Sequence, residues 1–203
     1  MRKRIWYNGA TYHITARGNR RNDIFRDEED FQVYLMFLEE ALFHFSHYNY
    51  KLIAYCLMDN HVHLMIKTDN KPLGVFIARL HSRYTRYFNK KYNYIGHLFQ
   101  DIYFAEIIED DTQMLETSRY VHLNPVKARM VDFPLDYKWS SYPMLIGKNE
   151  EKLINSEILL NYFKYEIRFK LYKEFGAREW LRPSQGPPAD CAKTSGIWYY
   201  KYY

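Results

Sequence analysis

The stretch KLIAYCLMDNHVHLMIK, residues 51–67, predicts a β-hairpin at the centre of the fold. Two apolar runs, 51–58 and 61–67, are joined by an Asp-Asn pair, which is typical of a tight turn. Side chains alternate between faces along a strand, so His61 and His63 share one face of the second run, and Val62 and Leu64 take the other. We expect the apolar set to face a core and the histidines to face outward.

The two histidines have the spacing of a chelating pair. Imidazole is a common ligand for Zn, Mn, Co and Ni ions, so one divalent cation suits His61 and His63. The same pair is equally compatible with two histidines on a polar sheet face. Spacing alone does not choose between these interpretations, and other parts of the chain must decide.

The segments around the hairpin predict two more strands and three helices. TYHITA (11–16) and YFAEIIE (103–109) have the composition of strands. Apolar periodicity predicts helices from Asp27, after Pro72 and from about Asp111 to Val121. The order β-α-β-β-α-β-α predicts an α+β fold of the ferredoxin-like or RRM-like split βαβ type, with an antiparallel sheet. Two helices would cover one sheet face and leave the other open.

Composition excludes several classes of protein. The chain has 203 residues, 47% of them hydrophobic, which is enough for one sizeable core. Its two cysteines, Cys56 and Cys191, form no CxxC pair, so no zinc knuckle or disulfide framework is indicated. No apolar run of about 18 residues and no signal peptide is visible. We therefore expect a cytoplasmic protein without a membrane partner.

Charge and aromatic content favour a nucleic-acid partner. The formal net charge is +5, and 19% of the residues are aromatic. Lys and Arg side chains meet phosphates, and ring faces stack on unpaired bases, so single-stranded nucleic acid fits best. Each basic candidate is also compatible with a solvated surface position. The candidate DNA contacts are Lys3, Arg4, Arg17, Arg20, Arg21, Arg79, Arg83 and Arg86.

A tyrosine and an asparagine stand out in the third predicted helix, LETSRYVHLNPVKARMV. Tyr120 and Asn124 are four residues apart and so lie on one helical face. Pro125 should end or kink the helix just past Asn124. The carboxamide of Asn124 is a possible oxygen ligand for a metal. Without further context, Tyr120 is better explained as a core residue.

Several blocks of the sequence together resemble a known family. YHITARGNRRNDIFRDEEDF, MDNHVHLMI, RYTRYFN, GHLFQ, RYVHLNPVKARMV and YKWSSY follow one another in the order found in HUH single-tyrosine, IS200-like transposases of the REP-associated branch. The resemblance runs from about residue 5 to residue 142. It implies that His61 and His63 bind a metal, that Tyr120 is the nucleophile and that Asn124 is the third ligand. Related transposases often have Gln in place of this Asn.

The resemblance implies a metal-dependent endonuclease and strand transferase. Its partner would be single-stranded DNA with a hairpin or palindrome, its cofactor Mg or Mn, and its intermediate a 5′-phosphotyrosine. A free phenol has a pKa near 10, so the metal or a base must activate Tyr120. His122 is close in sequence, but a helix would point it elsewhere. The protein would act as a monomer or as a homodimer that swaps the tyrosine helix, and a long loop before that helix would allow either arrangement.

Two other functions remain open from the sequence. One is a catalytically inactive or metal-free module that binds single-stranded nucleic acid, although the strands lack the aromatic RNP motif of RNA-recognition domains. The other is a replication initiator or relaxase, which usually has a longer chain or three histidines. We expect a transposase domain over 1–145, a helical C-terminal extension over 146–175 and a loosely structured tail over 176–203.

Overall fold

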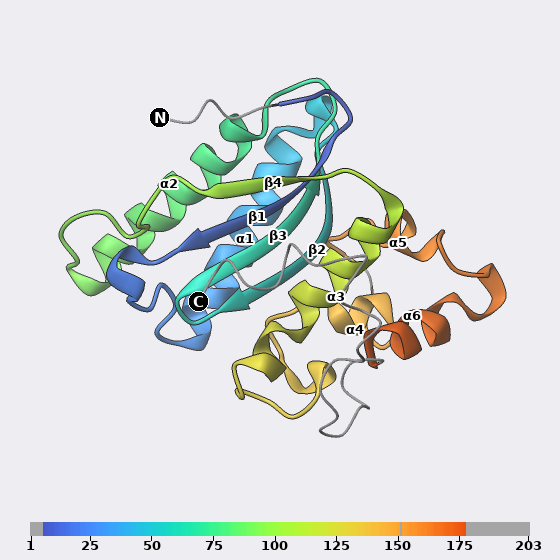
Figure 1. The fold of residues 1–203 in the computed structure, drawn as a ribbon. Coiled ribbons are helices and arrows are strands. Elements are labelled where there is room, and N and C mark those ends of the chain that lie inside the picture. Colours follow the sequence, from blue (N-terminus) through green and yellow to red (C-terminus); the bar gives the residue numbers. More distant parts are fainter. Residues whose placement is uncertain (1–5, 151, 178–203) are drawn as a thin grey trace, which may run out of the picture.

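A four-stranded antiparallel sheet forms the centre of the computed structural model, which describes residues 6–150 and 152–177 (Figure 1). The strand order is β2-β3-β1-β4. The predicted α+β, split βαβ fold is confirmed, with strands and helices in the expected sequence. The strands are β1 (Thr11–Arg17), β2 (Lys51–Met58), β3 (His61–Lys67) and β4 (Phe104–Ile108).

The hairpin has the predicted two-residue turn, because Met58 at the end of β2 pairs with His61 at the start of β3. On its other side β3 pairs with β1, and this register sets Thr15 opposite His63. Paired residues of neighbouring strands point to the same side of the sheet. The pairing of β1 with β3 therefore brings the His63 face of the hairpin together with one face of β1.

Helices α1 (Glu28–His44) and α2 (Leu73–Tyr92) cover one face of the sheet (Figure 1). The strand residues on this face are apolar, and Ile14, Val62 and Leu64 are fully buried. Helix α1 begins where predicted, because the side chain of Asp27 accepts a hydrogen bond from the backbone N–H of Asp30 at 3.1 Å. This face holds the core that the alternation of apolar residues indicated.

Helix α3 (Asp111–Lys127) lies on the opposite face, across β2 (Figure 1). The expectation of an open sheet face is therefore wrong for the part of the face formed by β2 and β3. The predicted helix end at Val121 is also wrong, because the helix continues past Pro125 to Lys127. A proline removes one hydrogen bond from the helical ladder and crowds the turn before it, but the turn after it can still form: the backbone N–H of Ala128 donates to Asn124 O at 2.9 Å.

The chain after α3 forms short helices that pack against it. Tyr172 of the last helix donates a hydrogen bond from its hydroxyl to Ser118 Oγ of α3 at 3.1 Å. Residues 178–203, which include most of the predicted tail, lie outside the described residues. Among the described residues no helix is long and apolar enough to span a membrane. The short helices are α4 (Tyr142–Leu145), α5 (Glu157–Leu160) and α6 (Arg168–Ala177), and the 3₁₀ turns are Asn19–Arg21, Ser46–Tyr48, Pro134–Asp136 and Tyr165–Ile167.

The basic loop after β1 is held between the hairpin turn and the GHLFQ segment. The N–H of Gly18 donates to Asn60 O at 2.8 Å, and the N–H of Asn19 donates to Leu98 O at 2.8 Å. A Cβ at Gly18 would lie 2.0 Å from Asn22 O, so this position requires glycine. Sequence reasoning found no role for GHLFQ, and the structure shows that it supports this loop.

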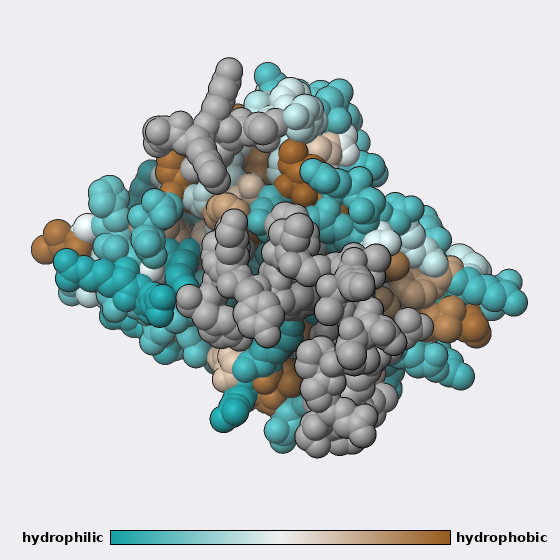
Figure 2. Space-filling model, in the orientation of Figure 1, coloured by the Kyte–Doolittle hydropathy of each residue, from teal (hydrophilic) through white to brown (hydrophobic). Residues whose placement is uncertain are grey.

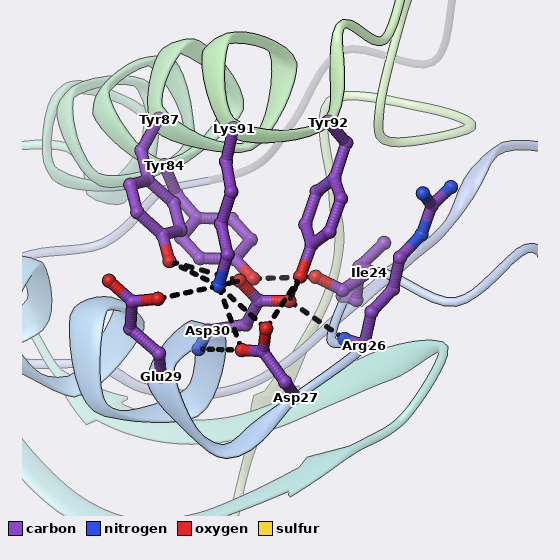
Figure 3. A network of polar contacts seen from close by, with 9 residues as sticks. All are labelled: Ile24, Arg26, Asp27, Glu29, Asp30, Tyr84, Tyr87, Lys91 and Tyr92. Atoms are coloured by element: carbon purple, nitrogen blue, oxygen red, sulfur yellow. Dashed lines mark hydrogen bonds and ion pairs between the residues drawn. The ribbon is translucent and has the colours of Figure 1, made fainter.

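A polar network joins the start of α1 to the end of α2 (Figure 3). Its centre is the fully buried carboxylate of Asp30. Asp30 accepts hydrogen bonds from the backbone N–H of Arg26 at 2.8 Å, Tyr87 OH at 3.0 Å, Tyr92 OH at 2.7 Å and Lys91 Nζ at 2.9 Å. Four donors satisfy the two carboxylate oxygens, which is what a buried charge needs. The network fixes the two helices of the core face to each other.

Candidate active site

Three histidines gather on the sheet face that α3 covers. The rings of His61 and His63 have centroids 4.9 Å apart, and His13 of β1 stacks on His63 at 5.2 Å. His63 is only 3% exposed, so the expectation that both histidines face solvent is wrong for this residue. The reason is α3, whose packing across the sheet was not visible in the local sequence pattern.

Helix α3 places Tyr120 against this cluster. The ring of Tyr120 meets His63 edge-on at 5.6 Å and His13 edge-on at 5.8 Å between centroids. Lys127, near the end of the same helix, has its Nζ 5.3 Å from the centre of the Tyr120 ring. The tyrosine and the histidines predicted from the sequence therefore come together within one chain.

The connection before α3 is short. Strand β4 ends at Ile108 and α3 begins at Asp111, so residues 109–110 alone join them. The long loop expected before the tyrosine helix is absent from this part of the described chain. With Tyr120 beside the histidines of its own chain, one chain holds all the residues of the candidate site.

The three histidines are held in the neutral form. Burial lowers the pKa of His13 to about 4, and burial together with the guanidinium of Arg17 lowers the pKa of His61 to about 4. Burial and the neighbouring His13 and His61 hold the pKa of His63 well below its usual range. Neutral imidazole is the form that binds metals, so the cluster is ready for a cation at neutral pH.

One nitrogen of the cluster indicates where a ligand would bind. His63 Nε2 is buried and has no hydrogen-bond partner among the described residues. Buried polar atoms without a partner are rare and costly in folded proteins. A divalent cation bound to Nε2 would satisfy this atom, so the chemistry of the cluster fits the metal implied by the sequence.

The third predicted ligand, Asn124, uses part of its side chain in a hydrogen bond within its own helix. The Nδ2 atom of Asn124 donates to the backbone O of Tyr120 at 2.8 Å, which leaves Oδ1 as its possible ligand atom. Across the described residues, no group of three or more His, Cys, Asp or Glu side chains is arranged to hold a metal. Ligation by Asn124 therefore stays a prediction.

His122 does not serve the tyrosine. It is buried on the far side of α3, with Nδ1 3.0 Å from Tyr172 OH and Nε2 2.9 Å from Ser141 Oγ. Burial lowers its pKa to about 3. Both ring nitrogens are occupied by hydroxyl groups, so the idea that His122 activates the phenol is wrong. Its role is to attach α3 to the C-terminal helices.

The predicted DNA contacts fall into two groups. Arg17, Arg20 and Arg21 are exposed at the end of β1, and Arg17 pairs in register with His61. This group borders the histidine face.

The surface of the molecule can be seen in the orientation of Figure 1. Around the grey atoms it is mostly hydrophilic, with hydrophobic residues in separate patches (Figure 2). Arg4 and Lys3 lie outside the described residues.

The second group lines a groove on α2, in the helical layer on the other side of the sheet. The groove has a volume of about 530 Å³. Arg79 Nε is buried there without a hydrogen-bond partner among the described residues. Arg83 is committed elsewhere, since it pairs with Glu40 and covers the Phe37 ring at 4.5 Å. The groove is lined by Ala78, Arg79, Ser82, Arg83 and Arg86.

Comparisons with known proteins show the family of the chain. The family model of IS200-like transposases matches residues 7–124, more than half of the chain and a span that includes the histidines, Tyr120 and Asn124. A Haemophilus influenzae protein assigned as a REP-associated tyrosine transposase is 29% identical over 109 residues, which are 48% of this chain and 61% of that protein.

Two solved structures are also similar. A REP-associated tyrosine transposase bound to a REP hairpin has a TM-score of 0.60 at 13% identity, covering 76% of this chain and 96% of its own. A crystal structure of a Deinococcus radiodurans protein, assigned as a transposase, has a TM-score of 0.41 at 19% identity. The match covers 60% of this chain and 95% of that chain. The first of these shows the same fold.

The matched family, the fold and the His-His-Tyr cluster define the class: the chain belongs to the IS200-like transposase family. Within that family its sequence is similar to the REP-associated tyrosine transposases.

Proposed function

We propose that this chain cleaves and rejoins single-stranded DNA at hairpin-bearing or palindromic elements, with Tyr120 as the nucleophile. The observation that carries the proposal is the contact of Tyr120 with the buried His63 and with His13 beside it, in one chain and within the span of the family match. A phenol beside neutral imidazoles that can bind a cation is an arrangement that suits metal-assisted phosphoryl transfer.

The reaction conserves the energy of the bond that it breaks. The Oη atom of Tyr120 attacks the scissile phosphorus in line, a P–O(Tyr) bond forms and the P–O3′ bond breaks. The phenolic proton is lost, and the leaving oxygen takes up a proton and becomes a 3′-OH. The downstream strand stays attached to the protein through a 5′-phosphotyrosine. A 3′-OH can later attack the same phosphorus and release Tyr120, so rejoining needs no ATP.

His61, His63 and Asn124 would hold the divalent cation, with Mg or Mn as the expected ion. When bound, the cation neutralises charge on the scissile phosphate and favours phenolate over phenol. The protein residues supply the rest. The histidines present neutral nitrogens, and α3 fixes the Tyr120 ring beside them.

We infer that the partner is hairpin DNA. A REP-associated transposase of the same fold is bound to a REP hairpin, and this chain has two basic surfaces that suit DNA phosphates. Arg17, Arg20 and Arg21 would contact the strand that enters the site. Arg79 and Arg86 in the α2 groove would contact DNA backbone on the other side of the sheet, and Arg83, which pairs with Glu40, would line the groove between them.

The double variant Arg79→Ala, Arg86→Ala is expected to weaken binding of hairpin DNA about 10-fold or more near 0.1 M salt. Each lost phosphate contact should also reduce the slope of log K against log salt by about 1. Fluorescence anisotropy over a salt series measures both quantities. The matched control removes two exposed charges elsewhere, Lys148→Ala with Lys173→Ala, and should change neither. Equal weakening by the two double variants would argue against a DNA-binding role for the groove.

The proposed function is tested by incubating the protein with single-stranded hairpin DNA labelled at one end or the other, with Mn²⁺ or with EDTA. With Mn²⁺, a 3′-end label is expected to migrate with the protein on a denaturing gel, and a 5′-end label to leave on a shorter strand that ends in a 3′-OH. EDTA should abolish both products. The reverse distribution of labels would mean a different covalent linkage.

The alternative, a catalytically inactive or metal-free binding module, predicts a different outcome of the same experiment. Hairpin DNA would bind with equal affinity in Mn²⁺ and EDTA, and no label would become attached to the protein across several palindromes. The geometry of the histidine cluster favours the enzyme, because a binding module has no use for a buried imidazole nitrogen without a partner.

A further inference from the structure

Asn60, in the turn of the hairpin, favours one tautomer of the neutral His61 ring. Its Nδ2 donates to Arg21 O at 3.3 Å, which fixes the orientation of the carboxamide. Its Oδ1 then lies 2.6 Å from His61 Nδ1. A carbonyl oxygen only accepts hydrogen bonds, so the proton of neutral His61 must be on Nδ1. The lone pair of the ring is consequently on Nε2.

His13 stands in the same relation to His63. His13 Nε2 lies 3.0 Å from His63 Nδ1, with Thr15 Oγ1 at 3.4 Å from the same atom. A proton on His63 Nε2 would be a buried N–H without an acceptor, since that atom has no partner among the described residues. A proton on Nδ1 has His13 Nε2 as its acceptor. The arrangement therefore favours the Nδ1–H form of His63 as well.

We propose that Asn60 and His13 are positioning residues that hold His61 and His63 in the Nδ1–H tautomer, so that both Nε2 atoms are free to bind the metal. The inference rests on the proposed function, because it needs a cation between the two histidines. Neither Asn60 nor His13 is the proposed nucleophile or a proposed metal ligand. In metal sites generally, the hydrogen bond on the second nitrogen of a ligating histidine fixes its tautomer and ring orientation.

The residue at position 60 must both donate and accept. Its amide donates to the backbone of Arg21, in the basic loop, and accepts from His61. Aspartate would keep the acceptor and lose the donor, and alanine would lose both. Asn60 has a negative φ, so alanine can adopt the same backbone conformation. The two substitutions separate the tautomer effect from the attachment of the loop.

The first measurement reads the tautomers directly, in the absence of metal. Long-range ¹H–¹⁵N spectra of the histidine rings at pH 7.5, assigned with His61→Gln and His63→Gln, should show Nδ1–H for both residues in the wild type. In Asn60→Ala, His61 should shift toward a mixture that includes Nε2–H, whereas His63 should not change. The control Asn161→Ala, at an exposed helix end, should leave both rings unchanged.

The second measurement is Mn²⁺ affinity without DNA, from the EPR signal of free Mn²⁺. Asn60→Ala and His13→Leu should each weaken binding about 10- to 100-fold. Asn60→Asp and His13→Gln retain an acceptor for the Nδ1 proton and should stay closer to the wild type. Circular dichroism establishes that each variant is folded.

The outcomes separate this inference from the proposed function. If the wild type binds Mn²⁺, and Asn60→Ala and His13→Leu keep both the tautomers and the affinity, the positioning role is overturned while the metal site stands. If the folded wild type binds neither Mn²⁺ nor Mg²⁺, the metal part of the proposed function fails, and the positioning role fails with it.

Discussion

Tyr120→Phe is expected to abolish covalent attachment of DNA and to lower strand cleavage at least about 10³-fold. Phenylalanine keeps the ring that packs edge-on against His63 and His13, and it removes only the hydroxyl oxygen that forms the bond to phosphorus. Binding of hairpin DNA and of Mn²⁺ should therefore stay close to the wild-type values. The loss would be confined to the chemical step.

The measurement is the yield of protein that carries the 3′-end label, followed over time on a denaturing gel. The matched control is Tyr165→Phe, which removes a phenolic hydroxyl from a tyrosine that is 73% exposed and far from the site in sequence. This variant should form the adduct at the wild-type rate. An adduct that persists in Tyr120→Phe would show that another residue is the nucleophile and would refute the proposed mechanism.

Local sequence patterns were sufficient for the fold. The alternation in residues 51–67 predicted the hairpin and its turn, and the 3.6-residue periodicity predicted α1 and α2. These patterns are local because each is produced by one strand or helix burying one face. The limits of α3 were harder to predict. A proline near a helix end does not determine where the helix stops, since the backbone N–H groups of Ala128 and Met130 still donate to Asn124 O and Pro125 O and close the last turn.

The sequence predicted only part of the candidate site, and the reason is physical. His61, His63, Tyr120 and Asn124 were named from their spacing and from the family resemblance. The predicted split βαβ order already sets the first strand, which carries His13, beside the hairpin. The hydrogen bond of His13 with His63 depends in addition on the register of these two strands, which that order does not specify. Asn60 was recognised only as a turn residue. Its contact with His61 depends on the fold of the Arg20–Arg21 loop, where both residues have positive φ.

Asp30→Ala is expected to lower the free energy of unfolding by about 3 kcal/mol. The substitution removes the acceptor of four donors in the network of Figure 3. Lys91 keeps Asp27 and Glu29 as partners, so the loss falls on the Arg26 N–H and the two phenols. Urea unfolding followed by circular dichroism measures the change.

The matched control is Glu29→Ala, which removes another carboxylate bound to Lys91, at 2.8 Å, but one that is mostly exposed. Exposed ion pairs contribute little, so this variant should unfold close to the wild type. An equal loss in both variants would mean that the stabilisation comes from ion pairing with Lys91 and not from the buried acceptor Asp30. None of the partners of Asp30 touches Tyr120 or the histidines. At a low temperature where the Asp30→Ala variant is still folded, it should therefore attach covalently to DNA. The stable Tyr120→Phe variant should not. This difference would separate the network that stabilises the fold from the residues that carry out the chemistry.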